Sequence, residues 1–251
     1  MYRDNLIGVV VPAYNEEQLI SKVIETMPDY VDNIYIIDDC STDQTFNVAS
    51  GFKEPRIKIT RHIKNRGVGA AIVTGYKQAL NDKMNIAAVM AGDNQMDPLQ
   101  LYKLLNPIID CQADYCKGDR LSSRELTTGM SNWRKLGNKI LTRLTRISSG
   151  YSKIQDPQNG YTAISMQALS SLNLDKIFHG YGYCNDILAK LNVINAKVMD
   201  VQIPARYGTE KSKIKYISYI PKVSLLLLKN YLWRISKTIC KNRRRNNECG
   251  L

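Results

Sequence analysis

A group of polar side chains follows an apolar run near the middle of the chain. Residues 86–89 are uniformly apolar, as in a buried strand, and the segment 91–97 (AGDNQMD) then brings acidic and amide side chains. The oxygens of Asp93 and Gln95 are of the kind that Mg²⁺ or Mn²⁺ accepts when a phosphate supplies further ligands. The alternative is a plain strand-to-helix loop, with Pro98 at the first helical position.

A second acidic segment, residues 38–43 (DDCSTD), follows another apolar run at residues 34–37. Parallel strands end at the same edge of a sheet, and carboxylates gathered there repel one another unless a cation or hydrogen-bond donors face them. We expect Asp39 to accept hydrogen bonds from a base or ribose, and Asp93 to hold a divalent ion and, through it, a pyrophosphate. The two segments together predict a nucleotide site.

Apolar runs and helix-like segments alternate through the first half of the chain. The predicted strands are residues 6–11, 34–37, 57–60 and 86–90, and the continuous apolar run at 6–11 is typical of a strand buried on both faces. The predicted helices run from the Pro12–Glu17 segment to about Met27, from beyond residue 43 to Ala49, and from Ala70 to Leu80. This βαβα alternation predicts an α/β fold with a covered, mostly parallel sheet.

The segment 66–71 (RGVGAA) offers a GxG pair before a helix, which is part of the fingerprint of a dinucleotide-binding turn. Ala71 stands where the third glycine of that fingerprint belongs, and the first strand-to-helix turn contains no glycine. The pattern therefore argues against an NAD site.

The charge of the chain is unevenly distributed. Residues 1–120 contain 13 basic and 16 acidic side chains, whereas residues 121–251 contain 22 and 7. An excess of basic charge on one half indicates an anionic partner such as a membrane surface or nucleic acid, although it also serves solubility. The six scattered cysteines contain no CxxC pair, which fits a reducing compartment and disfavours a zinc site.

Two segments of the basic half have membrane-surface character. Residues 131–149 place apolar side chains at helical spacing between basic ones, as in a helix that lies in a membrane interface. The alternative is a helix that packs its apolar side on the core. Residues 216–251 are apolar but interrupted by cations and end in a polybasic run, so lying on an anionic membrane is a better account than spanning it. No nucleic-acid recognition motif accompanies these arginines.

A polar, turn-rich segment at residues 155–160 (QDPQNG) contains Asp156. Asp156 is a candidate general base, or a residue that orients the sugar or acceptor if the acceptor is an already anionic lipid phosphate. An Asx-type turn is the structural alternative. Asn185 and Asp186 precede a predicted helix at residues 187–191, where they either cap the helix or contact a sugar.

Four of these segments resemble glycosyltransferase family 2 in their order and spacing. They are PAYNEE (12–17), IIDDCSTDQT (36–45), NRGVGAAIVTGY (65–76) and MAGDNQMDP (90–98). Two later segments, DPQNGY (156–161) and RYGTEKSK (206–213), resemble the polyprenyl-phosphate branch, which includes dolichyl-phosphate mannose and glucose synthases. The resemblance implies a GT-A fold with a mixed, mostly parallel sheet, a nucleotide-diphosphate sugar donor and interface helices on the membrane.

The resemblance also implies roles for individual residues. The nucleotide-sugar pocket would be formed by Pro12, Tyr14, Glu16, Ile37, Asp39, Ala91, Gly92, Asp93, Arg120 and Arg134. Asp93 and Gln95 would bind Mg²⁺ or Mn²⁺, and Asp93, Asp156, Arg206 and Lys213 would be catalytic. Many relatives read Asp-x-Asp where this chain reads Ala91-Gly92-Asp93, so one potential metal ligand is absent here.

The resulting hypothesis is an inverting glycosyltransferase on the cytosolic face of a membrane. It would move a sugar from a UDP-sugar, with GDP-mannose as the alternative donor, to a polyprenyl or dolichyl phosphate. Residues 1–215 would form the catalytic domain and residues 216–251 a membrane-associating segment. Two further hypotheses stay open: a family 2 transferase that acts on a polysaccharide or soluble hydroxyl, and a non-catalytic module that binds nucleotide sugars.

Overall fold

A computed structural model describes residues 1–120, 132–204 and 216–248 of the chain. Within these residues, one sheet has the strand order β3-β2-β1-β4-β6-β5-β7. The strands are β1 (Ile7–Ala13), β2 (Asn33–Asp38), β3 (Ile57–Arg61), β4 (Ile86–Val89), β5 (Tyr115–Asp119), β6 (Thr162–Ser165) and β7 (Val198–Gln202). Among them, β6 runs antiparallel to β4 and β5, and the other neighbours are parallel. The prediction of a mixed, mostly parallel sheet is confirmed.

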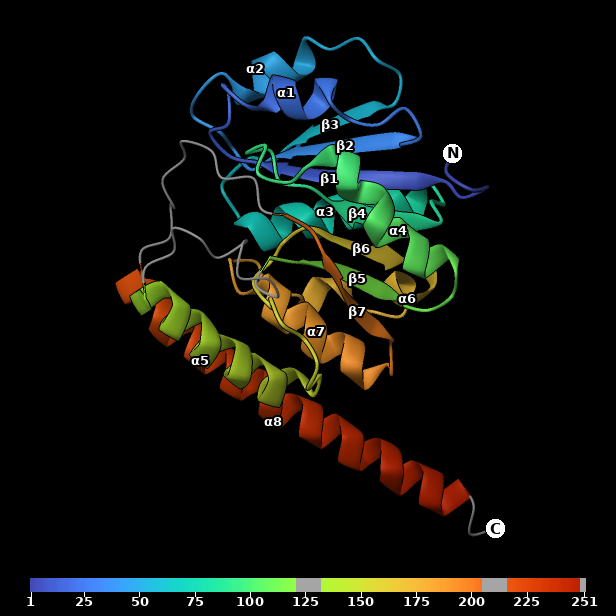
Figure 1. Cartoon of the computed structure of the whole chain (residues 1–251), viewed down its shortest axis with the longest axis vertical. Helices are drawn as coiled ribbons and strands as arrows, with labels where there is room; N and C mark the ends of the chain where they lie inside the picture. Colours follow the sequence, from blue (N-terminus) through green and yellow to red (C-terminus); the bar gives the residue numbers. More distant parts are fainter. Residues whose placement is uncertain (121–131, 205–215, 249–251) are drawn as a thin grey trace.

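Helices cover both faces of this sheet, as Figure 1 shows. They are α1 (Ile20–Glu25), α2 (Thr45–Ser50), α3 (Val68–Asn81), α4 (Leu101–Ile109), α5 (Asn132–Ser149), α6 (Met166–Ser170), α7 (Tyr183–Val193) and α8 (Tyr216–Glu248), with short 3₁₀ turns η1 (Pro98–Gln100) and η3 (Leu174–Lys176). Helices α3, α6 and α7 contribute to one apolar core, and α1, α2 and α4 contribute to the other. Alternate side chains of β1 and β2 enter the two cores, which explains their uninterrupted apolar sequence.

The first helix begins later than the sequence predicts. Strand β1 continues to Ala13, and α1 begins only at Ile20, so the expectation of a helix from the Pro12–Glu17 segment is wrong. Asn15 has a left-handed backbone with φ 56°, and the next N–H, that of Glu16, donates to the Thr45 hydroxyl at 2.7 Å. Side chains from a distant loop thus replace the helical hydrogen bonds that local sequence favours.

Two elements of the second half were not anticipated correctly. Strand β6 inserts between β4 and β5, where no strand was predicted from the sequence. Helix α7 begins at Tyr183 after Gly182, so Asn185 and Asp186 lie inside the helix and are buried rather than at its cap. Asp186 instead accepts a hydrogen bond from the Phe178 N–H at 2.7 Å and forms an ion pair with Lys190.

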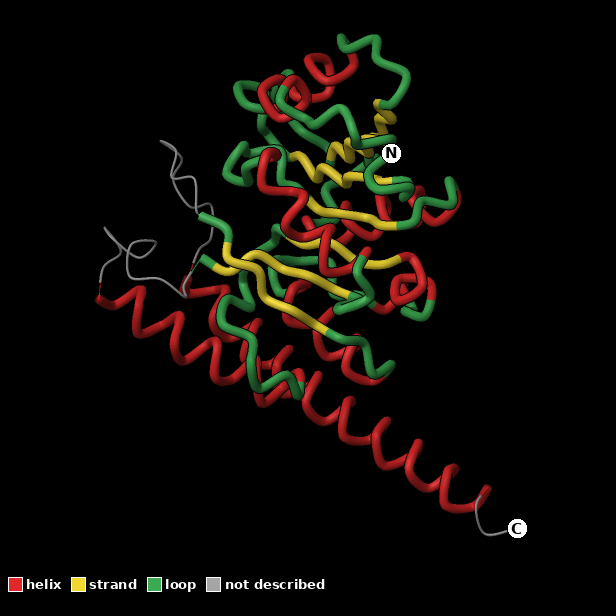
Figure 2. Tube along the Cα trace, turned by 45° about the vertical axis from the view of Figure 1, so that its right-hand side comes forward, coloured by secondary structure: helices red, strands yellow, loops and turns green. Residues whose placement is uncertain are grey.

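The predicted helices in the basic half are present as α5 and α8. They lie side by side at one end of the molecule, and α8 continues well past α5 (Figures 1 and 2). Both pack against α7. The Ser148 hydroxyl donates to the main-chain oxygen of Leu227 at 2.8 Å, and Nε of Arg234 donates to the main-chain oxygen of Ser148 at 2.9 Å. The boundary predicted at residue 215 falls outside the described residues and stays a prediction.

Helix α5 buries several small polar side chains and exposes three of its apolar ones, while Leu141 is partly buried. Thr142, Thr145, Ser148 and Ser149 are buried, whereas Ile140, Leu144 and Ile147 are 54%, 43% and 54% exposed. The exposure of these three residues argues against the alternative in which the whole apolar side packs on the core. On α8, exposed leucines recur at 225, 228 and 232 along one side. In the described part of the chain, no helix is both long and apolar enough to span a bilayer.

Candidate functional site

The loops after β1, β2, β4 and β5 leave the same edge of the sheet because these strands run in one direction. The chain moves outward from β1 to β3 and then returns to place β4 on the other side of β1. Such a switch point is where open α/β sheets bind ligands. The segment after β4 contacts the end of β1, since the Gly92 N–H donates to the main-chain oxygen of Pro12 in β1 at 3.1 Å.

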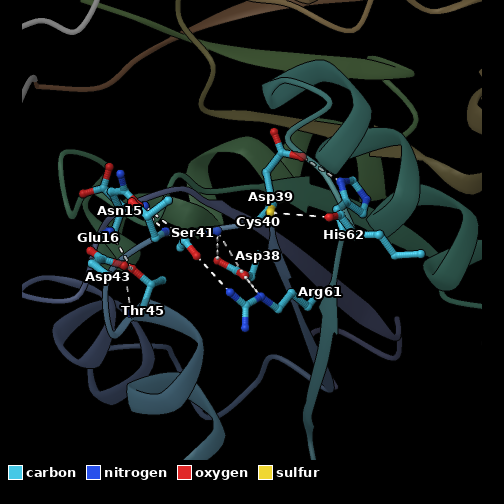
Figure 3. A network of polar contacts seen from close by, with 12 residues as sticks. Asn15, Glu16, Asp38, Asp39, Cys40, Ser41, Asp43, Thr45, Arg61 and His62 are labelled. Carbon is cyan, nitrogen blue, oxygen red and sulfur yellow. Dashed lines mark hydrogen bonds and ion pairs between the residues drawn. The ribbon is translucent and has the colours of Figure 1, made fainter.

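Polar contacts join the loop after β1 to the loop after β2, as Figure 3 shows. The Asn15 N–H donates to the Ser41 hydroxyl at 3.0 Å, and the Glu17 N–H donates to the Asp43 carboxylate at 3.3 Å. Burial raises the pKa of Asp43, but hydrogen bonds from Thr45 and the Glu17 N–H outweigh it and hold that pKa below its usual value. The two loops therefore form one cross-linked platform.

Asp39 is held by three donors and is almost fully buried. Its Oδ1 accepts from the Arg66 N–H at 2.9 Å and lies 2.7 Å from Nδ1 of His62, and its Oδ2 accepts from the Gly67 N–H at 2.7 Å. Gly67 has φ +91°, and a Cβ there would come within 2.6 Å of the His179 oxygen. In this structure Asp39 anchors the loop before α3. Its expected contact with a base or ribose stays a prediction.

A basic pocket lies beside Asp39. It has a volume of about 830 Å³ and is lined by Arg61, His62, Ile63, Lys64, Asn65, Arg66 and His179. Nε of Arg61 forms an ion pair with the buried Asp38 at 3.1 Å, so this residue of the pocket lining is linked to the end of β2. Arg61 and His62 were not among the site residues predicted from the sequence, although a histidine next to a strand-end arginine is a signal that could have indicated them. Concentrated positive charge suits a phosphate-bearing ligand.

Asp93 lies in a tight turn after β4. Its Oδ1 accepts from the Gln95 N–H at 3.1 Å, and the turn includes Asn94 with φ 56°. Asp93 is half-buried and Gln95 is exposed. The Asn94 Oδ1 is buried without a hydrogen-bond partner within the described residues. A buried amide oxygen without a donor, on the residue that follows Asp93, is chemistry that fits a hard divalent cation.

No group of three or more histidine, cysteine or carboxylate side chains in the described part of the chain is arranged to hold a metal. A cation bound here would therefore take Asp93, side-chain amides and the phosphates of a nucleotide as its ligands. The residues present fit that arrangement, which is the usual one for Mg²⁺ at a phosphate site. It also accords with Ala91 in place of a first carboxylate.

Asp156 and Arg120 form an ion pair at the end of β5, in which Asp156 is buried and Arg120 is partly exposed. Nε of Arg120 is 2.8 Å from Oδ2 of Asp156, and the two side chains are 38% and 2% exposed. Burial raises the pKa of Asp156, but Arg120 and Lys117 together outweigh it and hold that pKa below its usual value. A carboxylate that prefers to stay ionised and paired is a poor proton acceptor but a good orienting group.

The remaining predicted site residues are distributed as follows. Pro12 and Ile37 are neighbours across β1 and β2 and are buried, so both belong to the sheet beneath the loops. Tyr14 is 40% exposed and Glu16 is partly buried in the first loop. Arg134 lies in the first turn of α5, and its side chain is outside the described part. Arg206 and Lys213 lie outside the described residues altogether.

Solved structures with this architecture define its fold class. Glucosyl-3-phosphoglycerate synthase from Mycobacterium tuberculosis in complex with UDP matches with a TM-score of 0.65 at 21% identity, over 92% of this chain and 80% of that one. The complex of that enzyme with Mn²⁺, UDP and phosphoglyceric acid matches with a TM-score of 0.66 at 20% identity, over 92% and 78%. The chain therefore has the GT-A fold of nucleotide-diphosphate-sugar transferases.

Sequence relatives define the family. Residues 8–172 match the profile of Glycosyl transferase family 2. A UDP-N-acetylglucosamine–dolichyl-phosphate N-acetylglucosaminyltransferase from Methanococcus voltae is 30% identical over 244 residues, which cover 90% of this chain and 97% of the relative. A dolichol-phosphate mannosyltransferase from Pyrococcus furiosus is 28% identical over 83% of this chain and 59% of the relative. The chain belongs to glycosyltransferase family 2 and is a glycosyltransferase, as its motifs predicted.

Proposed function

We propose that this enzyme transfers a sugar from a UDP-sugar to a polyprenyl or dolichyl phosphate. The observation that carries the proposal is the ion pair between Arg120 and the buried Asp156. Transfer to a hydroxyl needs a base that removes a proton, and Asp156 is poorly suited to that role because its pKa is lowered by Arg120. A lipid phosphate is already anionic and needs no such base.

The names of the relatives support the same acceptor and donor. The Methanococcus voltae protein uses UDP-N-acetylglucosamine and dolichyl phosphate by its name, and its similarity extends over 97% of its length. The Pyrococcus furiosus relative is named for dolichol phosphate and mannose. We therefore favour a UDP-sugar donor and keep GDP-mannose as the alternative.

In the proposed reaction, an oxygen of the lipid phosphate attacks the anomeric carbon of the donor sugar. The bond between that carbon and the nucleoside diphosphate breaks on the opposite side, so the configuration inverts. Arg120, oriented by Asp156, would face the phosphates at the end of β5, and stabilising their charge is the usual largest catalytic term. A divalent ion held by Asp93 and Gln95 would neutralise the leaving diphosphate.

We further propose that α5 and α8 lie on the cytosolic face of a membrane. Their exposed apolar side chains Ile140, Leu144, Ile147, Leu225, Leu228, Leu232 and Ile239 are unusual for helix faces that meet only water. Exposed cations alternate with them, including Lys139, Arg143, Lys222, Lys229 and Lys237. An apolar face bordered by cations is complementary to an anionic bilayer surface and would bring the site to a lipid acceptor.

The test of the acceptor is transfer of radiolabelled sugar into an organic-extractable lipid by the purified protein. UDP-N-acetylglucosamine, UDP-glucose and GDP-mannose are each supplied with Mn²⁺ or Mg²⁺ and a polyprenyl or dolichyl phosphate. The same lipid as a free alcohol is the matched control and should accept no sugar. Label that stays water-soluble with every donor and lipid phosphate would overturn the acceptor, and transfer to soluble hydroxyls would favour the other branch of the family.

A further inference from the structure

Strand β5 buries a lysine. Lys117 is 0% exposed in a strand whose five residues are all buried. Burying an ammonium costs free energy unless it is paired or hydrogen-bonded, so a lysine in the centre of a buried strand needs partners. Nζ of Lys117 donates a hydrogen bond to the main-chain oxygen of Asp156, 39 residues further along the chain. Lys117 is thus hydrogen-bonded to the main chain of Asp156, the ion-pair partner of Arg120.

The same segment is held from the next strand. Asp200 on β7 is the register partner of Lys117, and its Oδ2 accepts a hydrogen bond from the Gln155 N–H. Burial raises the pKa of Asp200, with Lys117 acting in the opposite direction and Asp119 and Asp156 adding to the rise. The cation of Lys117 therefore lies among carboxylates that would repel one another in its absence. Asp200 therefore holds the N–H of Gln155, and Lys117 holds the main-chain oxygen of Asp156.

The Asp156 carboxylate in turn holds Arg120 through three hydrogen bonds. Its Oδ2 accepts from Nε of Arg120 at 2.8 Å and from the Arg120 N–H at 3.3 Å, and its Oδ1 accepts from Nη2 at 3.3 Å. These contacts set both the main chain and the guanidinium of Arg120 where β5 leaves the sheet. A two-point contact between guanidinium and carboxylate fixes orientation as well as position.

We propose that Lys117 is a positioning residue, with Asp200 as its partner, and that it orients Arg120 toward the donor diphosphate by fixing the main chain at Asp156. The proposal rests on the nucleotide-sugar part of the proposed function and does not depend on the acceptor. Loss of the ammonium would leave the main-chain oxygen of Asp156 with the Asn159 N–H, at 3.2 Å, as its remaining donor, and it would leave the neighbouring carboxylates unscreened. The Asp156 segment would then shift, and Arg120 would move with it.

The test is a double-mutant cycle read as the dissociation constant for UDP in the presence of Mn²⁺, measured by titration calorimetry. Lys117→Met removes the charge and keeps the length of the side chain, and Arg120→Gln removes the guanidinium. With Arg120 present, Lys117→Met is expected to weaken UDP binding by roughly 10- to 100-fold, as residues coupled through one hydrogen-bond network do. In the Arg120→Gln protein the same substitution should change UDP binding by less than about threefold.

The matched control is Lys190→Met. Lys190 is also largely buried and forms an ion pair with Asp186 at 2.5 Å, but it lies on α7. Its loss should lower the unfolding temperature and have equal effects on UDP binding in both backgrounds. Asp200→Asn, which keeps the size of the side chain, replaces Lys117→Met in the cycle if the latter does not fold, and it should show the same dependence on Arg120.

Equal losses from Lys117→Met with and without Arg120 would overturn the inference, because a purely structural lysine acts independently of Arg120. The same holds for Asp200→Asn. Failure of the lipid acceptor leaves the cycle unaffected, since the cycle measures nucleotide binding alone. A wild-type protein that binds no UDP with either Mn²⁺ or Mg²⁺ would overturn the donor assignment, and this inference would fall with it.

Discussion

The two ends of the polar sheet edge are built in different ways. Around β1 and β2, carboxylates such as Asp39 and Asp43 are satisfied mainly by backbone N–H groups and by hydroxyls of neighbouring loops. Around β5 and β7, carboxylates such as Asp156 and Asp200 face the cations Lys117 and Arg120. Neutral donors spread over a loop fix a shape, whereas a fixed cation also supplies charge. The first region is therefore mainly a cross-linked platform, with the basic pocket of Arg61, Lys64 and Arg66 beside it, whereas the second pairs its carboxylates with cations that it positions for phosphates.

The largest effect is expected between these two regions, at Asp93. Asp93→Asn removes the carboxylate at the proposed metal position, and we expect sugar transfer to fall by about 10²- to 10³-fold. The unfolding temperature should change little, because Asp93 is only half-buried. Asp175→Asn, which removes an exposed partner of Lys77, is the matched control and should leave transfer unchanged. Full activity of Asp93→Asn would show that the metal is held elsewhere.

Asp156→Asn separates orientation from base catalysis. An orienting Asp156 predicts a loss in kcat of about 10²-fold or less, with the shape of the pH–rate profile unchanged. The pKa of Asp156 lies below its usual value, so the group is ionised at every pH above about 5 and adds no acidic limb in that range. Disappearance of an acidic limb in the variant would instead identify Asp156 as a base.

The same ion pair makes a prediction about stability. Because its folded-state pKa is lowered, Asp156 contributes stability that is fully present above the usual carboxyl pKa of about 4 and is lost as the pH falls through the lower folded-state value. Wild type should therefore lose more stability than Asp156→Asn when the pH is lowered from 5 to 3. Urea titrations at both pH values measure this difference, and equal losses would contradict the burial of an ionised Asp156.

Asp39→Asn tests the platform. The amide would turn an NH₂ group toward donors that now contact Asp39, and we expect a loss of about 1–3 kcal/mol in the free energy of unfolding. Asp38→Asn removes the ion pair with Arg61 and provides the neighbouring comparison. Urea denaturation measures both losses, and UDP titration of the folded variants shows whether nucleotide binding is lost as well. An unchanged free energy of unfolding for Asp39→Asn would contradict the claim that the hydrogen bonds of Asp39 stabilise the platform around β1 and β2.

The smallest effects are expected on the helix faces. Leu225→Ser and Leu228→Ser should each weaken binding to vesicles of anionic lipid by roughly 3- to 30-fold without lowering the unfolding temperature, because both side chains are exposed. Leu227→Ser, at a buried neighbouring position, should lower the unfolding temperature instead. Vesicle sedimentation and thermal unfolding measure the two effects. Equal vesicle binding by wild type and the exposed-face variants would contradict the proposal that α8 lies on the membrane surface.

The sequence was most informative where a motif and its element are close together. The strands at 34–37 and 86–90 and the helix at 70–80 match β2, β4 and α3, because their apolar periodicity is local. The late start of α1 was missed since its loop N–H groups bond to side chains about 26–29 residues away. Strand β6 is four residues long and pairs antiparallel between distant strands, which no local pattern indicates.

The site shows the same division. Asp93 and its turn could be selected from one nine-residue segment, and the residue types alone indicated a hard cation. The partner of Asp156 could not be selected in this way, because Arg120 lies 36 residues before it and meets it only through the fold. Lys117 left one local signal, a charged residue inside a buried strand, but its role depends on contacts with Asp156 and Asp200.

The central claim is that a divalent cation at Asp93 joins a nucleotide diphosphate to this edge of the sheet. The most direct measurement is calorimetric titration of UDP into wild type and Asp93→Asn, each with and without Mn²⁺. We expect Mn²⁺ to tighten UDP binding by at least about tenfold in wild type and to have little effect in the variant. Equal affinities with and without Mn²⁺ in wild type, or an undiminished Mn²⁺ response in Asp93→Asn, would contradict the claim.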